Sequence, residues 1–148
     1  MISPQIWHDY GLSMVNKIED LKGFLRVKEE KHLHEQLKNF KNYPVLVFID
    51  TSSNSSAQNA DTYREINSAL VFILDEAISP QKATPEKELE IDNRMAMIAE
   101  EFKTILRSKK DGSGNPCSFL RQLNLNAIHQ DPVYNYLGMS GYSIDFEF

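Results

Sequence analysis

The chain has 148 residues, of which 41% are hydrophobic and 25% are charged, and its formal net charge is -5. This length and balance indicate one globular domain over residues 1–148, and they exclude a disordered or fibrous chain. The acidic balance argues against a protein that coats DNA, because such proteins cluster lysine and arginine against the phosphates. The single cysteine, Cys117, excludes an internal disulfide.

The first residues carry no basic region followed by an apolar run, so we expect no secretory signal. The longest apolar run, residues 69–74, is far shorter than the ~20 residues that a membrane-spanning helix needs. We therefore expect no membrane partner, and a protein made and used in the cytoplasm of its host cell.

Helix signals open the chain. Ser3 offers a capping hydroxyl, and Pro4 suits the first helical position. Apolar residues then recur at steps of three and four, which predicts an amphipathic helix over residues 4–22. Residues 24–27 follow as a short strand or an extended connector, and residues 29–39 as a second, more polar helix.

Two apolar runs predict the strands of the core. Residues 45–49 are five consecutive apolar residues between a proline and a polar turn, which is typical of a strand buried on both faces. Residues 63–74 predict a second strand, antiparallel to the first. The connection between them, residues 51–61, has almost nothing to bury and is predicted to be a long loop, a type of segment that is often functional.

The second half of the chain starts with another helix signal, Thr84 followed by Pro85. Apolar residues then trace one helical face, so we expect an amphipathic helix over residues 85–109 that packs across the sheet. Residues 111–116 form a turn, and residues 118–128 alternate apolar and polar side chains in the manner of a strand.

The closing stretch, residues 141–148, alternates four apolar side chains with three polar ones. In a strand this places all the apolar side chains on one face, so we expect a strand that completes the sheet and pins the end of the chain. The predicted order is α-α-β-β-α-β-β. It predicts an α+β fold, with a mainly antiparallel sheet of about four strands packed against the long amphipathic helix.

No motif indicates catalysis. His32 and His34 point to different faces of a helix, and no further cluster completes a metal site. The chain contains neither a nucleophile elbow nor a dinucleotide fingerprint, and Cys117 is expected to be structural. We expect no enzyme, no cofactor and no metal. One alternative is a hydrolase built around His129 and Asp131.

Three stretches and the order of elements carry a family resemblance. Residues 37–50 are a polar helix that runs through Tyr-Pro into a buried strand. Residues 88–109 are an amphipathic helix between two pairs of strands. Residues 132–135, Pro-Val-Tyr-Asn, lead through a short loop to the Gly-aromatic strand at 141–148. In these respects most of the chain resembles the tail-terminator and head–tail connector (neck) proteins of tailed bacteriophages.

This resemblance implies a small α+β protomer that forms a ring, typically of six copies, where head and tail of the virion join. Such a ring is assembled in the host cytoplasm, ends growth of the tail tube and docks the filled head, without an active site. The implied partners are further copies, tail-tube proteins and head-connector proteins. DNA would be only a passing cargo, which an acidic lumen would repel.

In a ring of this kind, exposed strand edges and long loops make the contacts. We hypothesise that residues 51–61 and the link at 77–84 reach neighbouring subunits. The candidate contact residues of the loop are Thr51, Ser52, Ser53, Asn54, Ser55, Ser56, Gln58, Asn59 and Asp61. Those of the outer face of the closing strand are Ser143, Asp145 and Glu147. The alternative from another class is a non-viral bacterial binding or adaptor domain that holds a peptide at a sheet edge.

The closing strand yields a direct test. Phe146→Asp should unfold the domain, because burying an unpaired carboxylate in an apolar face costs several kcal/mol. Asp145→Ala should leave the domain folded and at most disturb assembly. Circular dichroism and thermal unfolding of the two variants check this, and equal unfolding midpoints would contradict the assignment of the faces.

Overall fold

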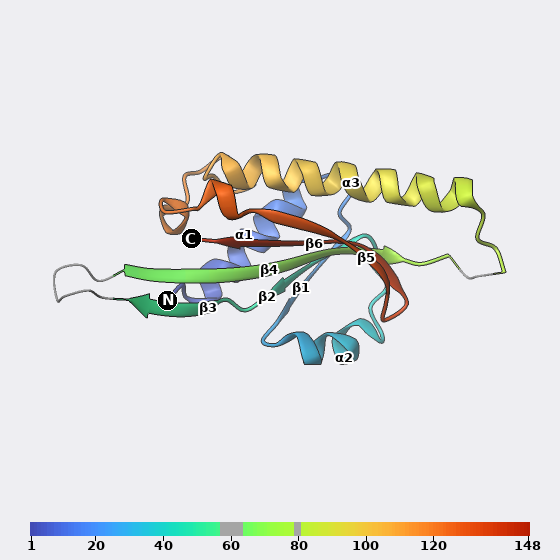
Figure 1. Cartoon of the computed structure of the whole chain (residues 1–148), viewed down its shortest axis with the longest axis horizontal. Helices are drawn as coiled ribbons and strands as arrows, with labels where there is room; N and C mark the ends of the chain where they lie inside the picture. Colours follow the sequence, from blue (N-terminus) through green and yellow to red (C-terminus); the bar gives the residue numbers. More distant parts are fainter. Residues whose placement is uncertain (57–63, 79–80) are drawn as a thin grey trace.

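The computed structural model describes residues 1–56, 64–78 and 81–148. A mixed six-stranded sheet lies between α1 and α3 on one face and α2 on the other (Figure 1). The elements in chain order are α1 (Pro4–Lys17), β1 (Gly23–Val27), η1 (Glu30–His32), α2 (Leu33–Leu37), β2 (Val45–Ile49), β3 (Ser52–Ser56), β4 (Arg64–Glu76), α3 (Pro85–Arg107), η2 (Ser118–Leu120), η3 (Leu125–Ala127), β5 (His129–Tyr136) and β6 (Met139–Glu147).

The sheet has the order β1-β2-β4-β6-β5, with β3 paired to β4 beside this path. Only the β1–β2 pair is parallel among the described strands. The predicted α+β class, with a mainly antiparallel sheet and a long packing helix, is therefore confirmed. The sheet has six strands instead of about four, because residues 23–27 form a full edge strand and the polar residues 52–56 also pair.

Both long helices begin where the sequence predicts. Ser3 Oγ accepts a hydrogen bond from the Ile6 amide at 3.2 Å, and Thr84 Oγ1 accepts one from the Lys87 amide at 3.3 Å. The first helix ends at Lys17, earlier than predicted, because Ile18 takes an extended conformation. Its apolar stripe nevertheless continues into the core, since the side chains that follow in the turn are also buried.

Two predictions in the connecting segments are wrong. The second helix is only the five residues of α2 preceded by a 3-10 turn. Residues 118–128 form two 3-10 turns instead of a strand, and the Asn124 side chain holds the second by accepting from the Asn126 amide at 3.2 Å. The strand β5, His129–Tyr136, then follows over residues for which no strand was predicted. It includes Pro132, which a strand at the edge of a sheet can accommodate.

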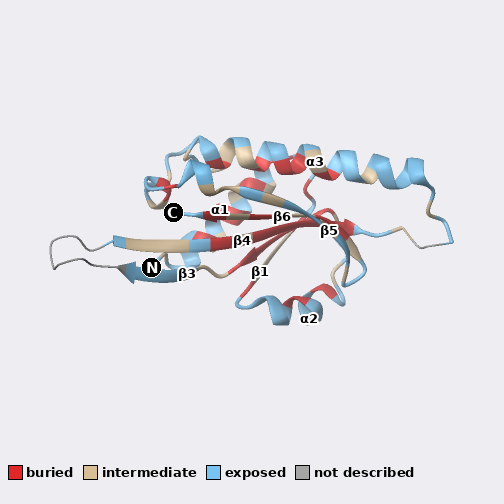
Figure 2. Ribbon diagram, viewed as in Figure 1, coloured by how far each residue is buried: buried red, intermediate tan, exposed pale blue. Residues whose placement is uncertain are grey.

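The main core lies between the sheet and the pair α1 and α3, where buried segments of these elements face one another (Figure 2). Trp7 is 1% exposed, its ring centroid is 4.4 Å from that of Phe48, and its Nε1 donates to the Ile49 carbonyl at 3.0 Å. A second cluster forms where α2 covers the opposite face of β1, β2 and β4. Burial on both faces explains the continuous apolar run of β2.

The closing strand β6 is interior, paired to β4 on one side and to β5 on the other, and so does not form the last strand of the sheet. Its predicted alternation is present: Ile144 and Phe146 are buried in the main core, while Asp145 is half-buried and Glu147 exposed. The end of the chain is held by Asn67, whose carbonyl accepts from the Phe148 amide at 2.9 Å.

The close approach of β6 to β4 generates a second test. A Cβ added at Gly141 would lie 1.9 Å from the Ile73 carbonyl oxygen, which is backbone that cannot rotate away. Gly141→Ala should therefore lower the free energy of unfolding by about 1–3 kcal/mol, a typical cost of overpacking. Ser143→Ala in the same strand is the matched control and should change it little. Denaturant unfolding measures both, and an unchanged midpoint for Gly141→Ala would contradict this packing.

Candidate functional site

The first candidate contact segment is partly a strand. Ser52–Ser56 pair antiparallel with Arg64–Ser68, in a register that runs from Ser52 opposite Ser68 to Ser56 opposite Arg64. We call this two-stranded ribbon the arm. The prediction of a loop at 51–61 is thus wrong for residues 52–56, because the backbone of β4 offers them a pairing edge that needs no apolar side chains. Gln58, Asn59 and Asp61 lie outside the described residues.

The arm extends past the rest of the sheet (Figure 1). Strand β6 ends beside Asn67, so beyond this point only β3 and the first residues of β4 remain paired. Ser52, Ser53 and Asn54 are exposed. An isolated two-stranded ribbon is marginally stable in water, so the outer part of the arm depends on contacts beyond its own backbone pairing.

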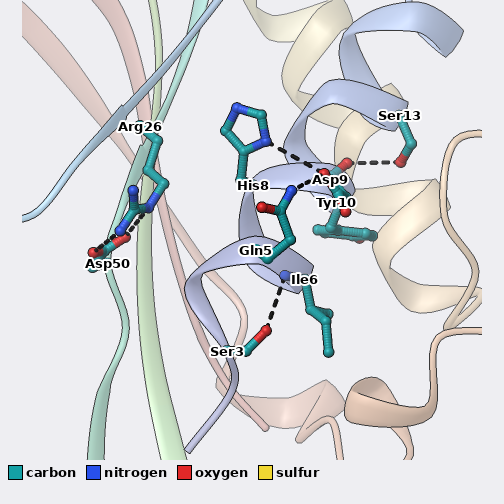
Figure 3. A network of polar contacts seen from close by, with 9 residues as sticks. All are labelled: Ser3, Gln5, Ile6, His8, Asp9, Tyr10, Ser13, Arg26 and Asp50. Atoms are coloured by element: carbon teal, nitrogen blue, oxygen red, sulfur yellow. Dashed lines mark hydrogen bonds and ion pairs between the residues drawn. The ribbon is translucent and has the colours of Figure 1, made fainter.

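Charged groups anchor the base of the arm. Arg26 of β1 donates two hydrogen bonds to Asp50, from Nε to Oδ1 and from Nη2 to Oδ2, both at 2.7 Å (Figure 3). Asp50 lies between β2 and Thr51, which is half-buried at the start of the arm. Further out along the arm, the amino group of Met1 pairs with Glu65, which stands opposite Ser55. The Arg26–Asp50 pair thus holds the chain where it enters the arm, and the Met1–Glu65 pair ties the arm to the start of the chain.

The second candidate set lies on the sheet face that α2 covers only in part. Asp145 stands opposite Leu70 of β4 and His129 of β5, and Glu147 stands opposite Ser68. Because Ser68 is also opposite Ser52, the polar face of β6 and the arm form one continuous surface. We call this surface the open face; its members on β6 are the predicted Ser143, Asp145 and Glu147. Of the first predicted set, the structure therefore places Ser52 and Asn54 on the same face as the second set.

The hydrolase alternative requires a base that is oriented by an acid. His129 and Asp131 are two residues apart on β5, so both project from the open face, and both are exposed. Among the described residues, no hydrogen bond joins His129 to either Asp131 or Asp145. Within residues 1–56, 64–78 and 81–148, no group of three or more His, Cys, Asp and Glu side chains is placed to hold a metal ion.

A cavity of about 450 Å³ opens where three distant segments meet. These are the first turns of α3, the link after β4 and the β5–β6 turn. Its lining includes Ala77 and Ala83 from the predicted contact link, together with Glu88, Asp92 and Tyr134. Sequence reasoning did not identify the last three. Along the chain, Tyr134 is marked only by the Pro132-Val133 pair before it. No pattern in the sequence connects this tyrosine with Glu88 and Asp92 of α3.

A comparison of the chain with protein-family models and with curated protein sequences gives no match. In the part of the chain that the structure describes, no helix combines the length and the apolar character needed to cross a membrane. The candidate site therefore consists of the arm, the open face and the cavity, as defined by geometry alone.

The environment of Cys117 predicts low reactivity. Burial, with a smaller contribution from the nearby Asp111 carboxylate, raises the pKa of its thiol from 9.0 to about 11. The thiol is the unreactive form, so at pH 8 the thiolate fraction should fall on the order of a hundredfold. We expect iodoacetamide to alkylate the native protein about that much more slowly than the urea-unfolded chain, as measured by mass spectrometry. Equal rates would contradict this assignment.

Proposed function

We propose that this chain is a ring-forming structural protein of a tailed-bacteriophage virion, of the tail-terminator or neck type. The observation that carries the proposal is the arm: a polar ribbon, held firmly at its base, that leaves the body of the protomer. The resemblance of residues 37–50, 88–109 and 132–148 to the phage family supplies the biological setting.

The arm is suited to contact with another chain for a physical reason. Its outer part carries serine, asparagine and charged side chains, and the half-buried Ile66 is the main apolar group on its described strands. Such a ribbon gains little from burial in its own protomer, whereas a neighbouring chain could cover its face or extend its pairing. In a structural protein that assembles into a ring, such an arm can make the contact between neighbouring copies.

The open face supports the same proposal through its charge. Asp131, Asp145 and Glu147 lie on it beside His129, and its one cation from the described part of the arm is Arg64, at the far end of β4. Carboxylates repel phosphate, so such a face, if directed at a channel, would let DNA pass without adhering to it. In this function the protein acts in the virion after assembly in the host cytoplasm, and it meets tail-tube and head-connector proteins without performing a reaction.

The proposal is tested first by mass in solution. Sedimentation velocity and negative-stain microscopy should show closed rings, with six copies favoured, that form as the concentration rises. A strict monomer over a wide range of concentrations would contradict ring formation. That result would favour the alternative of a bacterial adaptor domain that uses a sheet edge to hold a peptide.

A shortened arm tests the observation itself. Replacing residues 55–65 by Asn-Gly leaves Asn54 opposite Ile66, joined by the two residues that favour a tight hairpin turn. The variant should keep its circular dichroism spectrum and unfold within a few degrees of the parent, because the segment contributes little to either core. Its rings should be lost.

The control for the shortened arm is Ser53→Thr, which keeps the length and polarity of β3 and should form rings as the parent does. Rings of unchanged size in the shortened variant, measured by light scattering, would show that the arm makes no subunit contact.

A further inference from the structure

The two ends of α3 carry surfaces of opposite charge. At its first turns, the cavity described above is lined in part by the apolar residues Ala77, Ala83 and Ile91. Glu88 and Asp92, one helical turn apart, also line it and are exposed. The Tyr134 ring beside them is 81% exposed. A cavity of this make-up fits a long aliphatic side chain that ends in a cation. We call it the acidic cavity.

Beyond the last turn of α3 lies a basic surface. Lys110 and Arg121 are both exposed, and Arg107 lies close by in the sequence. Lys109 Nζ donates to the Arg121 carbonyl at 3.1 Å, which ties the segment after η2 to the end of the helix. Lys109, Lys110 and Arg121 also line a shallow hollow of about 290 Å³. We call this surface the basic end.

The helix dipole explains only part of this distribution. It favours Glu86 and Glu88 in the first turn and Arg107 in the last. Asp92 lies beyond the first turn, and Arg121 lies outside the helix altogether, so the dipole accounts for neither. Two other charged residues of α3 have partners in the same chain, Arg94 with Asp75 and Lys103 with Glu100.

No ion pair involves Glu88, Asp92, Lys110 or Arg121 within the residues that the structure describes. The acidic cavity and the basic end also cannot meet within one protomer. Helix α3 has 23 residues, which corresponds to about 35 Å, and the two surfaces lie at its opposite ends. Complementary surfaces held this far apart can combine only between copies.

We infer that the basic end of one copy docks in the acidic cavity of the next. The inference rests on the proposed ring and specifies one of its contacts. The stems of Lys110 and Arg121 would lie along the alanines and the isoleucine of the cavity lining, with their cations against Glu88 and Asp92 and near the face of Tyr134. Such a head-to-tail contact is heterologous, so it generates a closed ring when its rotation closes.

Charge reversal tests the contact. The variant with Glu88→Lys and Asp92→Lys, and the variant with Lys110→Glu and Arg121→Glu, each place like charges together. Each alone should raise the concentration needed for assembly at least about tenfold in sedimentation velocity. Mixing the two should restore assembly with the variants present in equal numbers, because each then meets a complementary surface. Assembly of the parent should also weaken as sodium chloride is raised.

The matched control reverses two exposed charges of α2 and its end, with Glu35→Lys and Lys38→Glu, and should assemble like the parent. If the parent forms rings and either reversed variant assembles equally well, the contact is wrong while the proposed function stands. Reversed variants that stay monomeric both alone and mixed, although folded by circular dichroism, would also overturn it. If the parent itself is a strict monomer, the proposed function and this contact fail together.

Discussion

The strand β4 is the element on which the rest of the structure depends. Its thirteen residues pair with β6 along one edge and, on the other, with β2 at their later half and β3 at their earlier half. Its later half, Ala69–Leu74, is apolar on both faces and so joins the two cores. A strand of this kind satisfies its backbone groups through the sheet, and hence can be buried on both sides.

The same strand also explains why the protomer has an arm. Toward Arg64, its side chains become polar and half-buried while its backbone still offers a pairing edge. A polar partner, β3, can therefore follow it beyond the last core residue. The result is a rigid body and a ribbon with little burial of its own, built on one continuous strand. The core and the arm therefore occupy different parts of its length.

The two proposed pairs of contact surfaces lie on different elements of the fold. The arm and the open face belong to the sheet, whereas the acidic cavity and the basic end belong to α3 and the turns at its ends. One helix about 35 Å long thus sets the separation of the end-to-end surfaces, while β4 sets the reach of the arm. A subunit with contacts fixed on two rigid elements can define the curvature of a ring without any chemical step.

Several elements could be predicted from neighbouring residues in the sequence alone. Val45–Ile49 is a strand because five apolar residues in a row can only be buried on both faces, and α3 begins at Pro85 because Thr84 caps it. Alternation alone was ambiguous at residues 118–128: Leu123 is buried while Leu125 is 52% exposed, a pattern that two 3-10 turns satisfy as well as a strand would.

By itself, then, the sequence determined the α+β class, the long packing helix and the apolar face of the closing strand, because each follows from the spacing of neighbouring residues. Only the tertiary structure decided that the closing strand is interior, that the serines of β3 form half of an arm, and that Glu88, Asp92 and Tyr134 share a cavity. The reason is physical: backbone pairing and the meeting of distant segments depend on which edges come together in space, and the side-chain pattern along the chain does not record this.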